Sequence, residues 1–108
     1  MSAGSEQYER VYSVIKTNVE SIGGGKSLIT LRIGLNFKGI INHYLKSGDF
    51  RLFADELPGP LAPSNFLSEI VDSRSYGEGD IKFELDDAIS RFTIVIEGKE
   101  DKKWVFTR

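Results

Sequence analysis

The chain has no cysteine, and of its 108 residues only one, His43, is a histidine. Disulfide bonds, thiolate metal sites and cysteine nucleophiles are therefore excluded, and a metal site made of several histidines cannot form within one chain. The absence of cysteine fits a reducing compartment, where disulfide bonds are rare. We therefore expect a cytoplasmic protein that carries no metal and no other cofactor.

Long apolar segments and excess positive charge are also lacking. The longest nearly apolar runs are about six residues, whereas a membrane-spanning helix needs about twenty. Residues 1–7 are small and polar, so no signal peptide is predicted. A net charge of −2 argues against a nucleic-acid binder that relies on a basic face. We expect neither nucleic acid nor a membrane as a partner.

The composition that remains is typical of a folded domain. Hydrophobic residues make up 40% of the chain and charged residues 28%, which are globular values. A chain of this length can bury a core without disulfide or metal support. We predict a single domain that spans residues 1–108.

The clearest pattern is a strict alternation of apolar and polar residues between Lys26 and Phe37. The apolar positions are Ile29, Leu31, Ile33, Leu35 and Phe37. A period of two places one face of an extended strand in a core. This segment is therefore predicted to be the central strand of a sheet.

Helices are predicted on both sides of this strand. Residues 5–22 place apolar side chains on one helical stripe, formed by Tyr8, Val11, Tyr12, Ile15, Val19 and Ile22. Residues 37–47 also fit a helical period, although a hairpin that turns at Ser47-Gly48 is the alternative. A third, short helix is predicted to begin at Pro63 or Ser64 and to run to Val71.

Further strands complete the predicted fold. Residues 50–54 form a short strand, the proline-containing segment 57–63 is irregular, and residues 73–80 form a loop. Three alternating segments, 81–85, 92–96 and 104–106, predict an antiparallel C-terminal β-meander. The fold class that follows is α+β, with an N-terminal amphipathic helix on a mainly antiparallel sheet of about four or five strands.

Two segments resemble motifs for phosphate or metal binding, but neither matches the residues and structural context that its motif requires. Gly23-Gly24-Gly25-Lys26-Ser27 resembles the end of a phosphate-binding loop, but it runs from a predicted helix into a strand, and Glu20 occupies the first glycine position. Asp86-Asp87 lies in an acidic region, but adjacent strand residues point to opposite faces and the calcium-loop pattern does not match. We expect a helix cap and turn in the first case, and solvated charges in the second.

Without a catalytic motif, the sequence favours a small non-enzymatic protein-binding module, such as an adaptor, a chaperone-like protein or a toxin-neutralising immunity protein. The residues predicted to contact the partner protein are Arg32, Tyr76, Glu78, Asp80 and Trp104. The alternative is a ligand-binding or hydrolase-like domain, in which Arg32, His43, Tyr44 or Asp87 would line a pocket between helix and sheet. Either function is compatible with a homodimer formed through an edge strand.

Overall fold

The computed structural model describes residues 9–38, 43–72, 75–96 and 99–108, and these ranges contain eight β-strands and no α-helix. The strands are β1 (Glu9–Gly23), β2 (Lys26–Lys38), β3 (His43–Lys46), β4 (Phe50–Phe53), β5 (Ser68–Val71), β6 (Ser75–Asp86), β7 (Arg91–Ile96) and β8 (Lys99–Thr107). One short 3-10 helix, η1 (Ser47–Asp49), separates β3 from β4. The described chain is all-β, so the predicted α+β fold is wrong.

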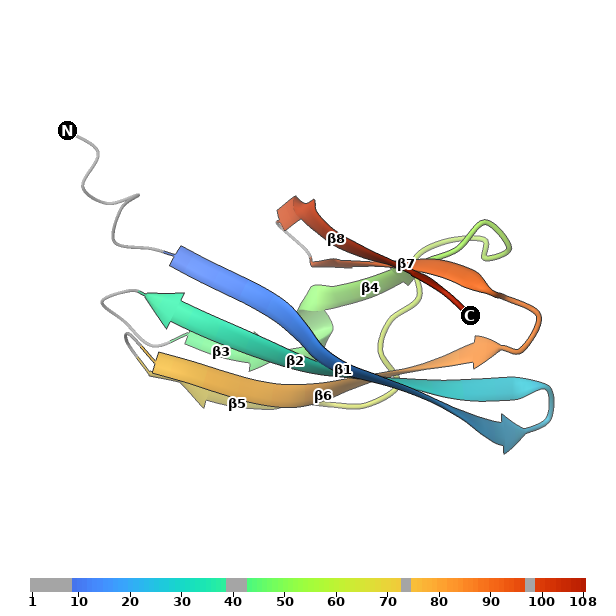
Figure 1. Ribbon diagram of the computed structural model, residues 1–108, viewed down its shortest axis with the longest axis horizontal. Coiled ribbons are helices and arrows are strands. Elements are labelled where there is room, and N and C mark those ends of the chain that lie inside the picture. Colours follow the sequence, from blue (N-terminus) through green and yellow to red (C-terminus); the bar gives the residue numbers. More distant parts are fainter. Residues whose placement is uncertain (1–8, 39–42, 73–74, 97–98) are drawn as a thin grey trace.

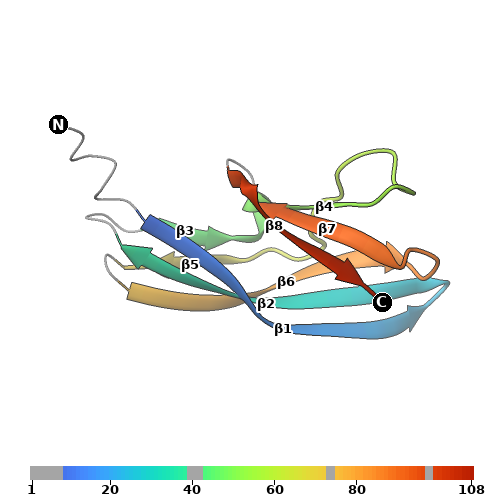
Figure 2. The ribbon, with the colours of Figure 1, turned by 45° about the horizontal axis from the view of Figure 1, so that its top comes forward.

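Two layers of strands enclose the core (Figures 1 and 2). The first layer is the antiparallel sheet β1-β2-β6, and the second contains the sheet β4-β7-β8 and the two-stranded ribbon β3-β5. The five alternating apolar side chains of β2 are completely buried between the layers, which confirms the predicted central strand. Tyr12 of β1 meets Phe50 of β4 edge-on, with ring centroids 5.9 Å apart, so the layers are in direct contact.

The predicted N-terminal helix is wrong because the described part of residues 5–22 belongs to β1. This strand pairs antiparallel with β2 along its length, and Gly23, Gly24 and Gly25 all have positive φ. The three glycines therefore form a hairpin turn rather than the end of a helix. Most apolar residues of the segment are valine or isoleucine, whose branched side chains suit a pleated strand. Backbone pairing with β2 therefore makes this segment a strand, although its apolar residues also fit a helical period.

The other two predicted helices are also replaced by strands. Residues 37–38 continue β2 and residues 43–46 form β3, while residues 39–42 lie outside the described residues. The end of the predicted helix 64–71 is β5. Where the sequence predicts a loop at 73–80, β6 already begins at Ser75. The predicted short strand at residues 50–54 is confirmed, because β4 spans Phe50–Phe53.

The C-terminal β-meander is only partly correct. The hairpin β7-β8 forms as predicted, but β6 pairs with β2, whereas β7 pairs with β4 and β8. The connection from β6 to β7 therefore crosses between the two layers. Its Asp87 carboxylate accepts a hydrogen bond from the hydroxyl of Ser27, and its amide donates to the carbonyl of Gly25 at 2.9 Å. The acidic pair at Asp86-Asp87 thus includes a structural contact to the β1-β2 turn.

Candidate functional site

Polar side chains gather on the solvent side of the sheet β1-β2-β6, which we call the outer face. Paired residues of neighbouring strands point to the same side of a sheet, and Arg32 lies opposite Asp80 while Asn36 lies opposite Tyr76. Because the alternate residues of β2 fill the core, these positions face the solvent. The outer face is formed by Val11, Ile15, Lys16, Arg32, Asn36, Tyr76, Glu78 and Asp80.

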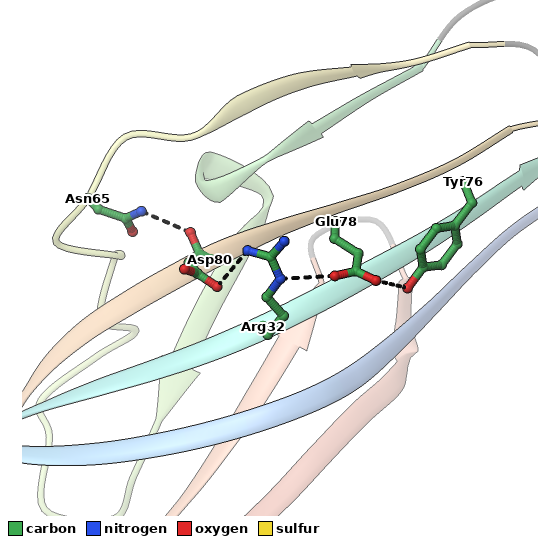
Figure 3. A network of polar contacts seen from close by, with 5 residues as sticks. All are labelled: Arg32, Asn65, Tyr76, Glu78 and Asp80. Atoms are coloured by element: carbon green, nitrogen blue, oxygen red, sulfur yellow. Dashed lines mark hydrogen bonds and ion pairs between the residues drawn. The ribbon is translucent and has the colours of Figure 1, made fainter.

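Arg32 bridges two carboxylates on the neighbouring strand (Figure 3). Its Nε donates to Glu78 Oε1 at 3.0 Å, and an Nη donates to Asp80 Oδ1 at 3.2 Å. The hydroxyl of Tyr76 donates to the other oxygen of Glu78 at 2.8 Å. These four side chains form a continuous chain of polar contacts along β6, in which each group fixes the orientation of the next.

The contacts shift the pKa values of Glu78, Tyr76 and Arg32. Hydrogen bonds from Tyr76 and Arg32 lower the pKa of Glu78 below its ordinary value. The bond to Glu78 raises the pKa of Tyr76, and the bonds to Glu78 and Asp80 raise the pKa of Arg32. At neutral pH the outer face therefore presents a charged Arg32 guanidinium, a neutral Tyr76 phenol and the Glu78 carboxylate.

An apolar patch borders this polar chain. A β-bulge between Val14 and Lys16 breaks the alternation of β1 and places Ile15 over Gly34, beside the hydroxyl of Tyr76. Ile15 and Tyr76 remain 48% and 53% exposed although they cover the glycine. Val11 lies in the same row as Tyr76 and is also exposed. Apolar surface and ordered charges are thus adjacent on one face of the sheet.

The segment before β5 closes the β6 edge of the first sheet (Figure 3). The Asn65 side chain donates to the carbonyl of Asp80 at 2.9 Å and accepts from the amide of Lys82 at 2.8 Å. The amide of Ser64 donates to the carbonyl of Lys82 at 2.7 Å. Asn65 therefore takes the place of a neighbouring strand and fixes the backbone on which Asp80 is carried.

The structure brings together four of the five residues predicted to contact a partner. Arg32, Tyr76, Glu78 and Asp80 form the polar chain on the outer face. Trp104 does not belong to this group, because it lies on β8 in the other layer and packs half-buried against the core. The position of Trp104 therefore does not support the prediction that it contacts a partner protein together with the other four residues.

Sequence reasoning missed three residues of interest. The sequence predicts Ile15 on the apolar stripe of a helix, and it assigns no role to Asn65. Phe66 lies within the predicted short helix that ends at Val71, and its side chain is 90% exposed. The high content of β-branched residues in residues 11–22 was the signal that would have placed Ile15 on a strand. No sequence signal marks Asn65, because its partners are backbone groups of a distant strand.

The described residues do not form the predicted pocket. Arg32, Tyr44 and Asp87 lie on the outer face, on β3 and in the β6-β7 connection, and the side chain of His43 lies outside the described residues. A hollow of about 440 Å³ lies between η1 and residues 62–68. Its Lys46 ammonium approaches the carboxylate of Asp49 at 3.9 Å. Within the described ranges, no three histidine, aspartate or glutamate side chains gather as a metal site would require.

Comparison with known proteins relates the chain to another protein by fold. No protein-family model matches it, and no curated protein sequence matches it significantly. Its structure is similar to the crystal structure of YcdA, a putative lipoprotein from Bacillus subtilis, with a TM-score of 0.62 over 94% of this chain. The match spans 38% of YcdA, at 10% sequence identity. The two share the fold. A search of the described residues found no helix long and apolar enough to cross a membrane.

Proposed function

We propose that the protein is a non-enzymatic binding module for another protein, and that it binds through the outer face. The single observation that carries the proposal is the ordered chain Tyr76–Glu78–Arg32–Asp80 beside the exposed side chain of Ile15. Tyrosine and arginine are enriched among the residues that dominate protein–protein binding energies. An exposed apolar side chain next to them supplies area that a partner can cover.

Order among these side chains favours binding because it lowers the entropy lost on association. A free arginine or glutamate loses rotamer freedom when a partner immobilises it, at a cost of about 0.5–1.5 kcal/mol per side chain. The guanidinium of Arg32 is already held by two carboxylates and Glu78 by two donors. These side chains therefore lose much of their rotamer entropy during folding, and less is lost when the partner binds.

Affinity capture with matched variants tests this proposal. Three tagged baits are compared in lysate of the source organism: the wild type, the double variant Ile15→Ser/Tyr76→Ala, and Val105→Ser. Val105 is 51% exposed on β8 in the other layer, so its change removes apolar surface far from the outer face. We expect one stoichiometric partner with the wild type and Val105→Ser, and its loss with the double variant.

Two results of this experiment contradict the proposal. One is that the wild-type protein recovers no stoichiometric partner from its native lysate. The other is that all three baits recover the same partner in equal amount, which would place binding elsewhere. Denaturation curves of the three baits show whether any loss of capture reflects loss of folding.

The cytoplasmic location expected from the lack of cysteine is part of this proposal. An adaptor, a chaperone-like protein and an immunity protein would each meet its partner there. Cell fractionation of the native protein with a specific antibody tests the location. Recovery of the protein in the membrane or extracellular fraction would contradict it.

A further inference from the structure

The free edge of β1 is the second feature that suggests binding, and it shares only Ile15 and Lys16 with the outer face. In the described structure β1 pairs only with β2, so no described strand lies beside the other edge of residues 15–22 (Figures 1 and 2). Every residue from Ile15 to Lys26 is exposed. Val19 and Ile22 are 46% and 47% exposed, although Val19 lies opposite the buried Ile29. A long, uncovered edge strand that carries exposed apolar side chains is a template for addition of another strand.

The charged residues along this edge indicate which kind of strand can pair with it. Lys16 and Glu20 pair with Arg32 and Leu28 of β2, which places both side chains on the outer side of the sheet. A lysine on an edge strand ordinarily discourages strand addition. Here a carboxylate stands four residues further on the same side, so an antiparallel copy of the same segment offers opposite charge to both positions. The edge of β1 is therefore complementary to itself.

We propose that β1 pairs antiparallel with β1 of a second copy of this chain, about a two-fold axis at Asn18. In this register Lys16 lies opposite Glu20 of the second copy, Glu20 lies opposite its Lys16, and Thr17 lies opposite its Val19. Opposite charges directly across a sheet are favourable, and like charges there are unfavourable. The paired segment 16–20 has the ordinary length of a strand, roughly 5–6 residues.

Pairing in this register also covers apolar surface. Beyond the charged pair, Ile22 of one copy comes beside Ile15 of the other on the outer side of the sheet. Ile15 and Ile22 are both about half exposed in the single chain. The two first sheets then join into one sheet in the order β6-β2-β1-β1-β2-β6, which is an ordinary sheet size. An isologous contact of this kind closes on itself and does not grow into a fibre.

Charge-swap variants and sedimentation test the register. We expect the wild type to form a dimer as its concentration rises from about 10 μM to 1 mM, as weak contacts do. K16E places two like-charged pairs across the axis, and so does E20K, so each variant should weaken the dimer at least tenfold. Mixed together, the two variants should form a one-to-one heterodimer, because one edge is then acidic and the other basic. The double variant K16E/E20K restores both attractive pairs and should dimerise like the wild type.

K103E is the matched control, because it makes the same charge change at an exposed lysine on β8 of the other layer. It should dimerise like the wild type. Amide hydrogen exchange in residues 16–20 should slow as the dimer forms. A wild type that stays monomeric at 1 mM would overturn the proposal. So would a dimer that K16E and E20K leave unchanged, because its contact would then lie elsewhere.

Discussion

The side chain of Leu67 occupies the space that a β-carbon on Gly79 would need. Gly79 lies on the buried side of β6, and Leu67 reaches it from the segment just before β5. Val71 of β5 fills the corresponding space at Gly77. Glycines inside a strand often mark such a close approach. These two glycines allow the β3-β5 ribbon to pack against β6, on the side of the sheet opposite the outer face.

Gly79→Ala should therefore destabilise the protein by overpacking. We expect the free energy of unfolding to fall by about 1–3 kcal/mol, measured by urea denaturation. Leu67→Ala in the same chain makes room for the new methyl group, so the double variant should lose less than the sum of the single changes. Gly59→Ala is the control, because nothing lies within 4 Å of its β-carbon position. Equal stability of Gly79→Ala and wild type would show that Leu67 moves aside without cost.

Asn65→Leu should open the covered edge of β6. The substitution removes both side-chain bonds to the backbone of Asp80 and Lys82 while keeping a similar volume. We expect a loss of about 1–3 kcal/mol in stability, because half-buried backbone groups lose their partners. Amide exchange at Lys82 should become faster. Asn36→Ala, on the exposed outer face, is the control. Unchanged exchange at Lys82 would mean that Asn65 does not protect this edge.

The lowered pKa of Glu78 predicts a dependence of stability on acid. Its carboxylate is favoured in the folded state, so its contribution is present above the ordinary value of 4.5 and is lost as the pH falls through the lower folded pKa. Denaturation curves between pH 7 and pH 3 should show this loss in the wild type and a weaker one in Glu78→Gln. Glu84→Gln, an exposed change on the same strand, should keep the wild-type slope. Parallel slopes for wild type and Glu78→Gln would contradict the prediction.

The pKa of Tyr76 should respond in opposite directions to its two neighbours. The bond to Glu78 raises this pKa above its ordinary value, and the charge of Arg32 lowers it. Glu78→Gln should therefore bring the Tyr76 pKa down, and Arg32→Ala should raise it. Titration of the tyrosine ring carbons by NMR measures both shifts. Shifts in the same direction would show that the polar chain does not persist in solution.

Arg32→Ala should affect binding more than folding. Its ion pairs with Glu78 and Asp80 are exposed, and exposed ion pairs contribute little to stability. We expect the midpoint of urea denaturation to stay near that of the wild type, while capture of the partner protein falls at least tenfold. A large drop in the midpoint would instead assign Arg32 a structural role.

The sequence by itself determined the central strand and its two faces. Strict alternation in residues 29–37 has one physical meaning, because side chains of a strand point alternately to its two sides. It also selected four polar residues that the structure places together. The alternation of side chains along a strand explains only part of this grouping, because Arg32 lies on a different strand from the other three residues. Tyr76, Glu78 and Asp80 share a face because each is two residues from the next on strand β6. The sequence pattern predicts a loop for this part of β6.

Only the tertiary structure decided that the predicted helical segments form strands, and which strands pair with one another. Residues 11–22 satisfy a helical period and a strand propensity at once, and the choice depends on the hydrogen bonds that β2 offers along the whole segment. From sequence alone, Gly77 and Gly79 predict a loop. In the structure they lie in a strand, and the side chains of Val71 and Leu67 occupy the space where their β-carbons would be. The register that brings Arg32 opposite Asp80 joins residues 48 apart. Such pairings arise from the packing of distant segments, which local sequence patterns do not encode.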